Sequence, residues 1–131
     1  MTVQSLHAFQ DQVSELLLRH RSLLDVLSKT GQSGASVNRA VAKAITECGC
    51  IEVHAKKQDY ELEASLEDAK AQLDNHVQGS LCENCKEVIM SELGRSLFYM
   101  SALCNLLEIN LEDVVERESQ KCSTLGLFNM S

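Results

Sequence analysis

Apolar residues recur at helical spacing along most of the chain and predict four helices. Leu93, Leu97 and Met100 show the pattern well, because they follow one another at intervals of four and three residues. The helices predicted in this way cover residues 3–28, a segment that starts at Val37 and passes Ile51, residues 81–107, and a short stretch after Asn110.

The segments between the predicted helices are polar or rich in small residues. "KTGQSGAS" (29–36) predicts a loop that ends in a helix N-cap at Ser36. Residues 57–80 predict a partly exposed helical connector, and residues 120–131 a loop-like tail. No segment alternates in the manner of a strand. The chain, 1–131, is therefore predicted to form a single all-α domain, a four-helix bundle.

Charge and composition exclude several classes of partner. The 12 basic and 19 acidic residues give a net charge of −7, which argues against binding nucleic acid or an anionic membrane surface. No apolar run is long enough to span a bilayer. Polar residues such as Asp11 and Glu15 interrupt the first 20 positions, unlike a signal peptide, so we expect a cytoplasmic protein. Its six cysteines are then expected to be reduced thiols.

Polar side chains that share a helix face give the candidate site residues. One face of the second predicted helix carries Glu47, Cys50 and His54. One face of the third carries Cys85, Glu92, Arg95 and Tyr99. Residues three or four apart share a face, so Glu47 and Glu92 either face each other across the bundle or reach solvent at its rim. Cys48 points away from Cys50 on such a helix and is predicted to be a core residue.

Two motifs resemble those of a known family. "SELGRSLFYMSALCNLLEINLEDVVE" (91–116) is similar to the second motif of the MazG-like all-α nucleotide pyrophosphohydrolases, and the match includes Glu92, Gly94 and Asn105. "ITECGCIEV" (45–53) resembles the first motif. The resemblance implies the all-alpha NTP pyrophosphatase fold, a homo-oligomer (a dimer), and Mg²⁺-dependent hydrolysis of a nucleoside triphosphate. Carboxylates would hold the metal in such a site.

The chain departs from the family pattern at two of four carboxylate positions. Cys50 and Arg95 stand where the family has acidic residues, so the resemblance leaves only Glu47 and Glu92 as Mg²⁺ ligands. Arg95 is free to pair with either glutamate or to grip a phosphate. Asn105 lies near the nucleotide in the family. We therefore expect Mg²⁺-dependent hydrolysis to be absent or very weak, with nucleotide binding retained at Arg95 and Asn105.

The thiols offer an alternative chemistry. If the two motif helices are antiparallel neighbours, Cys50 and His54 approach the "CENC" segment, which contains Cys82 and Cys85. These four residues form a soft ligand set that suits Zn²⁺ better than Mg²⁺. Three hypotheses follow: a nucleotide-binding MazG-like protein, a non-catalytic helical module, and a zinc-binding or redox-responsive protein. The alternative is that the cysteines are buried or unreactive thiols with neither metal nor redox chemistry.

Overall fold

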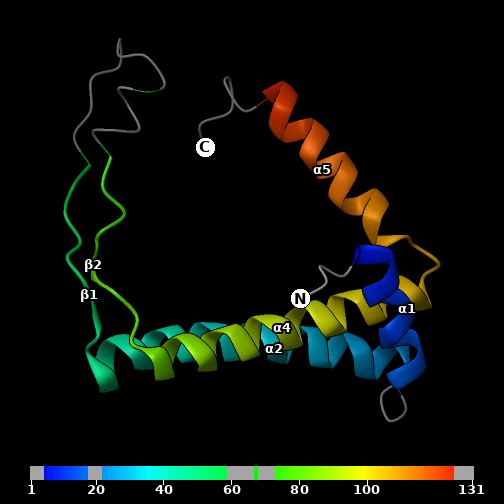
Figure 1. Ribbon diagram of the computed structural model, residues 1–131, viewed down its shortest axis with the longest axis horizontal. Helices are drawn as coiled ribbons and strands as arrows, with labels where there is room; N and C mark the ends of the chain where they lie inside the picture. Colours follow the sequence, from blue (N-terminus) through cyan, green and yellow to red (C-terminus); the bar gives the residue numbers. More distant parts are fainter. Residues whose placement is uncertain (1–4, 18–21, 59–66, 68–72, 126–131) are drawn as a thin grey trace.

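The computed structural model describes residues 5–17, 22–58, 67 and 73–125 (Figure 1). The elements in chain order are α1 (Leu6–Leu16), α2 (Leu23–Lys43), the π-helical turn η1 (Ala44–Cys48), β1 (Ile51–Val53), β2 (Val77–Gly79), α4 (Glu83–Leu106) and α5 (Leu111–Leu125). The prediction of a mostly helical chain is confirmed, and a small two-stranded sheet accompanies the helices.

The long helices α2 and α4 lie side by side and run in opposite directions (Figure 1). Two apolar clusters hold this pair together. Near the start of α2, Val26 packs with Val13 of α1 and Ala102 of α4. Near the end of α2, Ala44 packs with Ile51 and Ile89. The core is thus divided between the two ends of the pair, and each end fixes a different neighbouring element.

The end near α1 is fastened by one buried amide. Gln10 is only 7% exposed. Its Nε2 donates to the Ile109 carbonyl at 2.7 Å, and its Oε1 accepts from the Leu111 N–H at 2.8 Å. Asn105 donates to the Gln10 carbonyl at 3.0 Å. These bonds satisfy backbone groups at the turn into α5, where Leu111 is the one residue of that helix that the structure shows as buried.

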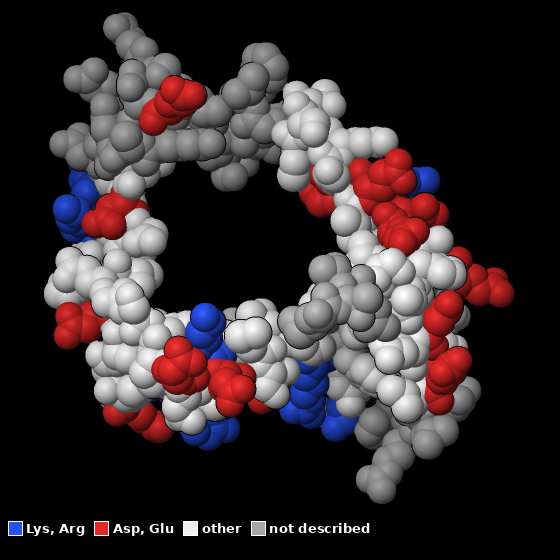
Figure 2. All heavy atoms as spheres, in the orientation of Figure 1, with Lys and Arg blue, Asp and Glu red and all other residues white. Residues whose placement is uncertain are grey.

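The opposite end carries a β-hairpin. Strands β1 and β2 are antiparallel, and Ile51 pairs with Gly79 while Val53 pairs with Val77. The hairpin and α5 project from the same side of the α2–α4 pair, so that the described elements surround three sides of a wide opening (Figure 2). Helix α5 projects away from the α2–α4 pair instead of packing along it (Figure 1). The four-helix bundle therefore stays a prediction.

Several predicted boundaries were wrong. Residues 29–36 are helical rather than a loop, because Ser33 is fully buried and donates to the Thr30 carbonyl, and neither Gly31 nor Gly34 has a positive φ. The first helix ends at Leu16 rather than continuing to residue 28.

The predicted connector and tail also need correction. The connector contains β2, although most of its length, 59–66 and 68–72, lies outside the described residues. The predicted tail is helical as far as Leu125, since α5 continues without a break, and its last six residues lie outside the described part.

Candidate metal centre

Gly49 ends the second helix and turns the chain between two cysteines. The helix widens into the π-helical turn η1, and Gly49 then adopts a left-handed conformation with φ of 78°. Its N–H donates to the Ala44 carbonyl at 2.8 Å. Glycine adopts this conformation without the steric cost that a Cβ imposes. The helical path therefore stops between Cys48 and Cys50, and both thiols reach the same side.

The hairpin brings this turn to the start of α4. Gly79 has φ of 90°, and a Cβ placed on it would lie 2.5 Å from the carbonyl oxygen of Cys50. Only glycine permits so close an approach between the two strands. Three residues after Gly79, Cys82 caps the start of α4, because its Sγ accepts the Cys85 N–H at 3.4 Å. The "CENC" segment therefore meets the Cys48–Cys50 turn.

The sulfur atoms of Cys48, Cys50, Cys82 and Cys85 all lie within 4.8 Å of one another. The Sγ atoms of Cys48 and Cys82 are 3.8 Å apart. A tetrahedral zinc ion with Zn–S bonds of about 2.3 Å requires its sulfur ligands to be about 3.8 Å from each other. The four thiols thus form a group of the size and chemistry that a soft metal ion needs.

The centre lies at the edge of the second apolar cluster. Cys50 and Cys85 are half-buried and pack against the cluster of Ala44, Ile51 and Ile89, whereas Cys48 is exposed. All six cysteines are free thiols. The remaining two, Cys104 in α4 and Cys122 in α5, lie outside the group.

The thiols strongly affect one another's protonation. Hydrogen bonds from the Cys85 backbone N–H and then the Cys85 thiol lower the pKa of Cys82 to about 7. The same thiol contact, with a smaller contribution from burial, raises the pKa of Cys85 to about 12. The Cys82 thiolate thus forms readily near neutral pH, whereas Cys85, and Cys48 with its raised pKa, retain their protons. A bound cation would displace those protons and take over the stabilisation of the thiolates.

The structure changes the predicted ligand set at two positions. Cys48, predicted to be a core residue, is exposed and belongs to the group, because the helix on which that prediction relied ends at Gly49. His54 is not in the group: it lies just beyond β1, and its Nε2 is 2.9 Å from Glu52 Oε2. The useful signal in the sequence was the glycine in "CGC", which permits a turn that places both thiols in the same group.

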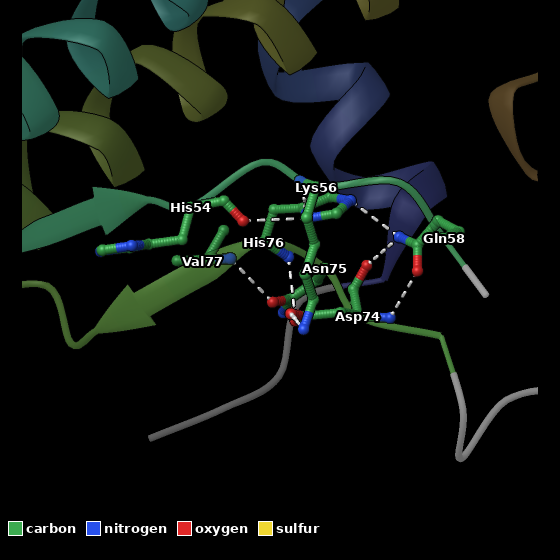
Figure 3. Close-up of polar contacts among 7 residues, drawn as sticks. All are labelled: His54, Lys56, Gln58, Asp74, Asn75, His76 and Val77. Atoms are coloured by element: carbon green, nitrogen blue, oxygen red, sulfur yellow. Dashed lines mark hydrogen bonds and ion pairs between the residues drawn. The ribbon is translucent and has the colours of Figure 1, made fainter.

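A polar network continues the hairpin beyond its strands (Figure 3). The His54 N–H donates to the His76 carbonyl at 2.8 Å, and His76 Nδ1 lies 3.1 Å from the His54 carbonyl. Gln58 contacts both His76 and Asp74: its Nε2 lies 2.8 Å from His76 Nε2, and its Oε1 accepts the Asp74 N–H at 3.0 Å. Both nearby histidines are therefore engaged in the hairpin, away from the cysteines.

The residues suggested by the family resemblance are spread along the α2–α4 pair. Glu47 lines a cavity beside Cys48, whereas Glu92 lines a neighbouring cavity on α4. Arg95 Nη1 lies 4.0 Å from Glu92 Oε2, and the two side chains form an ion pair within α4. Asn105 is at the other end of α4, bonded to Gln10. Glu47 and Glu92 thus line adjoining cavities that share Asn84 and Val88, whereas Asn105 lies apart from both.

Comparison with known proteins yields no match. No family model, no curated protein and no solved structure matches the chain. Among the described residues, no helix has the length and apolar character needed to cross a membrane. Inference about function therefore depends on the site itself.

Proposed function

We propose that Cys48, Cys50, Cys82 and Cys85 bind one zinc ion, and that the protein is a zinc-binding helical protein. The mutual approach of the four sulfur atoms to within 4.8 Å carries this proposal. Two pairs of closely spaced cysteines, one at a helix end and one at a helix start, supply the ligands. Thiolates favour zinc over magnesium or calcium, which prefer oxygen.

The proposed role of the zinc is structural. Four protein sulfurs complete a tetrahedral coordination shell and leave no position for a water molecule or substrate. The ion would join the end of α2, the hairpin and the start of α4. In the structure these elements meet through the small cluster of Ala44, Ile51 and Ile89 and a thiol contact between Cys48 and Cys82. Such a centre would fix the hairpin on the helix pair.

Metal analysis of the purified protein tests this role. We expect one zinc per chain, and a Co²⁺-substituted protein should show the intense thiolate-to-metal absorption of tetrahedral sulfur coordination. Cys48→Ser should lower the zinc content and weaken retention against a chelator. Cys122→Ser is the matched control, because Cys122 is an exposed thiol outside the group. Equal zinc content in both variants would refute the proposed ligand set.

A second candidate function is nucleotide binding, as the MazG-like motifs imply. It is favoured by Glu92, whose Oε2 is buried and has no hydrogen-bond partner. Glu92 lines a cavity of about 520 Å³ together with Asn84, Glu87 and Ser91. A sugar hydroxyl or base amino group of a nucleotide would supply the donor that this oxygen needs. Cys50 and Arg95 still argue against standard Mg²⁺-dependent hydrolysis.

Two assays address the nucleotide proposal. Incubation with Mg²⁺ and common nucleoside triphosphates should release little or no pyrophosphate. Titration calorimetry with a non-hydrolysable triphosphate analogue should show binding that Glu92→Gln weakens. Glu118→Gln, on the exposed surface of α5, is the control and should leave binding unchanged. Absence of binding to the unmodified protein would exclude this candidate without affecting the zinc proposal.

A further inference from the structure

Cys48 is the accessible thiol of the cysteine group. It is exposed, whereas Cys50, Cys82 and Cys85 are half-buried. It also lines a cavity of about 300 Å³ whose walls come from α2, η1 and α4. A molecule as small as hydrogen peroxide has room there beside the Cys48 side chain. Because exposure and thiolate character decide which cysteine is oxidised, Cys48 is the first thiol of the group that an oxidant in solution would meet.

Cys82 is the thiol placed to complete a disulfide with Cys48. The two Sγ atoms are 3.8 Å apart. A disulfide bond is about 2.05 Å long, so the sulfurs need to approach each other by less than about 2 Å. Two sulfur ligands on one zinc ion have a similar separation of about 3.8 Å, so the pair stays within reach when metal is bound. Cys50 and Cys85 are held elsewhere, because both pack against the second apolar cluster.

We propose that Cys48 is a site of oxidation by peroxides, and that Cys82 converts the oxidised thiol into a Cys48–Cys82 disulfide with release of the zinc ion. This inference rests on the zinc centre proposed above. The disulfide would remove two of the four sulfur ligands from the metal. Cys50 and Cys85 alone do not complete a tetrahedral site, so competing ligands would take the ion.

The reaction with hydrogen peroxide balances in two steps. Cysteines that bind zinc are thiolates, so the Cys48 sulfur can attack one peroxide oxygen. An S–O bond forms, the O–O bond breaks, and the departing hydroxide takes up a proton. The Cys82 thiolate then attacks the Cys48 sulfur, which forms the S–S bond and releases a second hydroxide that also takes up a proton. The two thiolates lose two electrons, and the peroxide becomes two water molecules.

The disulfide would preserve one of the connections that the zinc ion makes and abolish the others. Cys48 and Cys82 are 34 positions apart in the sequence, and a bond between them joins the end of η1 to the start of α4. Cys50, which leads into β1, loses its attachment when the ion departs. Oxidation would therefore loosen the hairpin while the two helix ends stay joined.

Peroxide treatment of the zinc-loaded protein tests the proposal. One equivalent of hydrogen peroxide should release the zinc, measured with a chromophoric chelator, and lower the number of free thiols by two. Peptide mass spectrometry should find Cys48 joined to Cys82, and a thiol reductant should restore zinc binding. Zinc that stays bound after oxidation would overturn the proposal, and so would a Cys82–Cys85 disulfide in place of the Cys48–Cys82 bond.

Cys48→His separates oxidation from zinc binding. An imidazole nitrogen can still bind zinc but cannot form a disulfide. The zinc-loaded variant should release its metal at least about tenfold more slowly than the unmodified protein when peroxide is added. Cys122→Ser is the matched control, because Cys122 is an exposed thiol outside the group, and it should release zinc at the unmodified rate. Release from Cys48→His as fast as from this control would contradict the assignment of Cys48.

The zinc content before oxidation distinguishes failure of this inference from failure of the zinc proposal. A protein that contains no zinc and takes none up would refute the metal centre, and release by oxidation with it. Disulfide mapping of that metal-free protein would then decide the Cys48–Cys82 pairing by itself. A zinc-loaded protein that forms no Cys48–Cys82 bond would refute the oxidation site alone.

Discussion

The two ends of the α2–α4 pair are closed by different chemistry. At one end, Gln10 and Asn105 satisfy backbone groups by amide hydrogen bonds beside the cluster around Val26. At the other, four thiols gather beside the smaller cluster of Ala44, Ile51 and Ile89. The first end needs nothing from solution, whereas the zinc ion that we propose would stabilise the second. One end of the helix pair is thus stabilised by the chain alone, and the stability of the other end is expected to depend on a bound metal ion.

Removal of the metal is the strongest way to separate the two ends. Structural zinc sites bind with apparent free energies of about 10–16 kcal/mol, so losing the ion should release the hairpin. In hydrogen-exchange mass spectrometry, a chelator should reduce protection of β1 and β2 at least about a hundredfold. Protection of α1 should change less than about tenfold. Equal loss of protection at both ends would show that the fold is a single metal-dependent unit.

Gln10→Ala tests the opposite end of the helix pair, the end near α1. It leaves the buried N–H of Leu111 and the carbonyl of Ile109 without their partners, which should lower the free energy of unfolding by about 1–3 kcal/mol. Zinc content should stay the same. Chemical denaturation measures the loss, with Gln32→Ala as an exposed control on α2. A Gln10→Ala variant as stable as the control would contradict the role given to this amide.

The pH dependence of thiol reactivity sharpens the description of the cysteine end. Because the pKa of Cys82 is lowered from 9.0 to about 7, its thiolate population in the metal-free protein should rise as pH rises through about 7. Cys85, raised to about 12, should stay protonated over the same range. Alkylation followed by peptide mass spectrometry should therefore label Cys82 first, and its rate should reach half of its maximum near neutral pH. Faster labelling of Cys85 would reverse this assignment.

The smallest effect is expected for the Arg95–Glu92 ion pair, which lies on α4 between the two ends of the helix pair. The Arg95–Glu92 pair is separated by 4.0 Å, and the Arg95 side chain is 45% exposed. Pairs of this kind contribute little because solvent screens them, so Arg95→Ala should change the free energy of unfolding by less than about 0.5 kcal/mol. Thermal denaturation beside Lys121→Ala, which removes a similar exposed pair on α5, measures the difference. A loss of several kcal/mol would mean that solvent does not screen the Arg95–Glu92 pair.

The sequence predicts the continuous helix well and the turns poorly. Residues 81–107 were expected to be helical, and α4 covers Glu83–Leu106, because its pattern is local and uninterrupted. Residues 29–36, in the interior of α2, were predicted to form a loop, but their helical state depends on packing around the buried Ser33. Local propensity carries no information about such tertiary support.

The cysteine group was only partly predictable. The approach of Cys50 to Cys82 and Cys85 was predicted from an antiparallel pairing of two helices. The structure has this pairing, α2 beside α4, and adds a hairpin in which Ile51 lies opposite Gly79. Strands of three residues are too short to show alternation. Extending the helical pattern past Gly49 placed Cys48 on the wrong side, which shows how one left-handed residue changes a predicted ligand set.

The hairpin has a further consequence for how the sequence can vary. Strand β1 ends at Val53 and β2 begins at Val77, and the strand pairing holds these two residues side by side. Closing a longer loop between fixed ends costs only about 0.6 kcal/mol for each doubling of its length. A zinc centre at the base of the hairpin would offset that cost, so insertions or an added module between Gln58 and Asp74, beyond the polar network, should be tolerated without disturbing the helix pair.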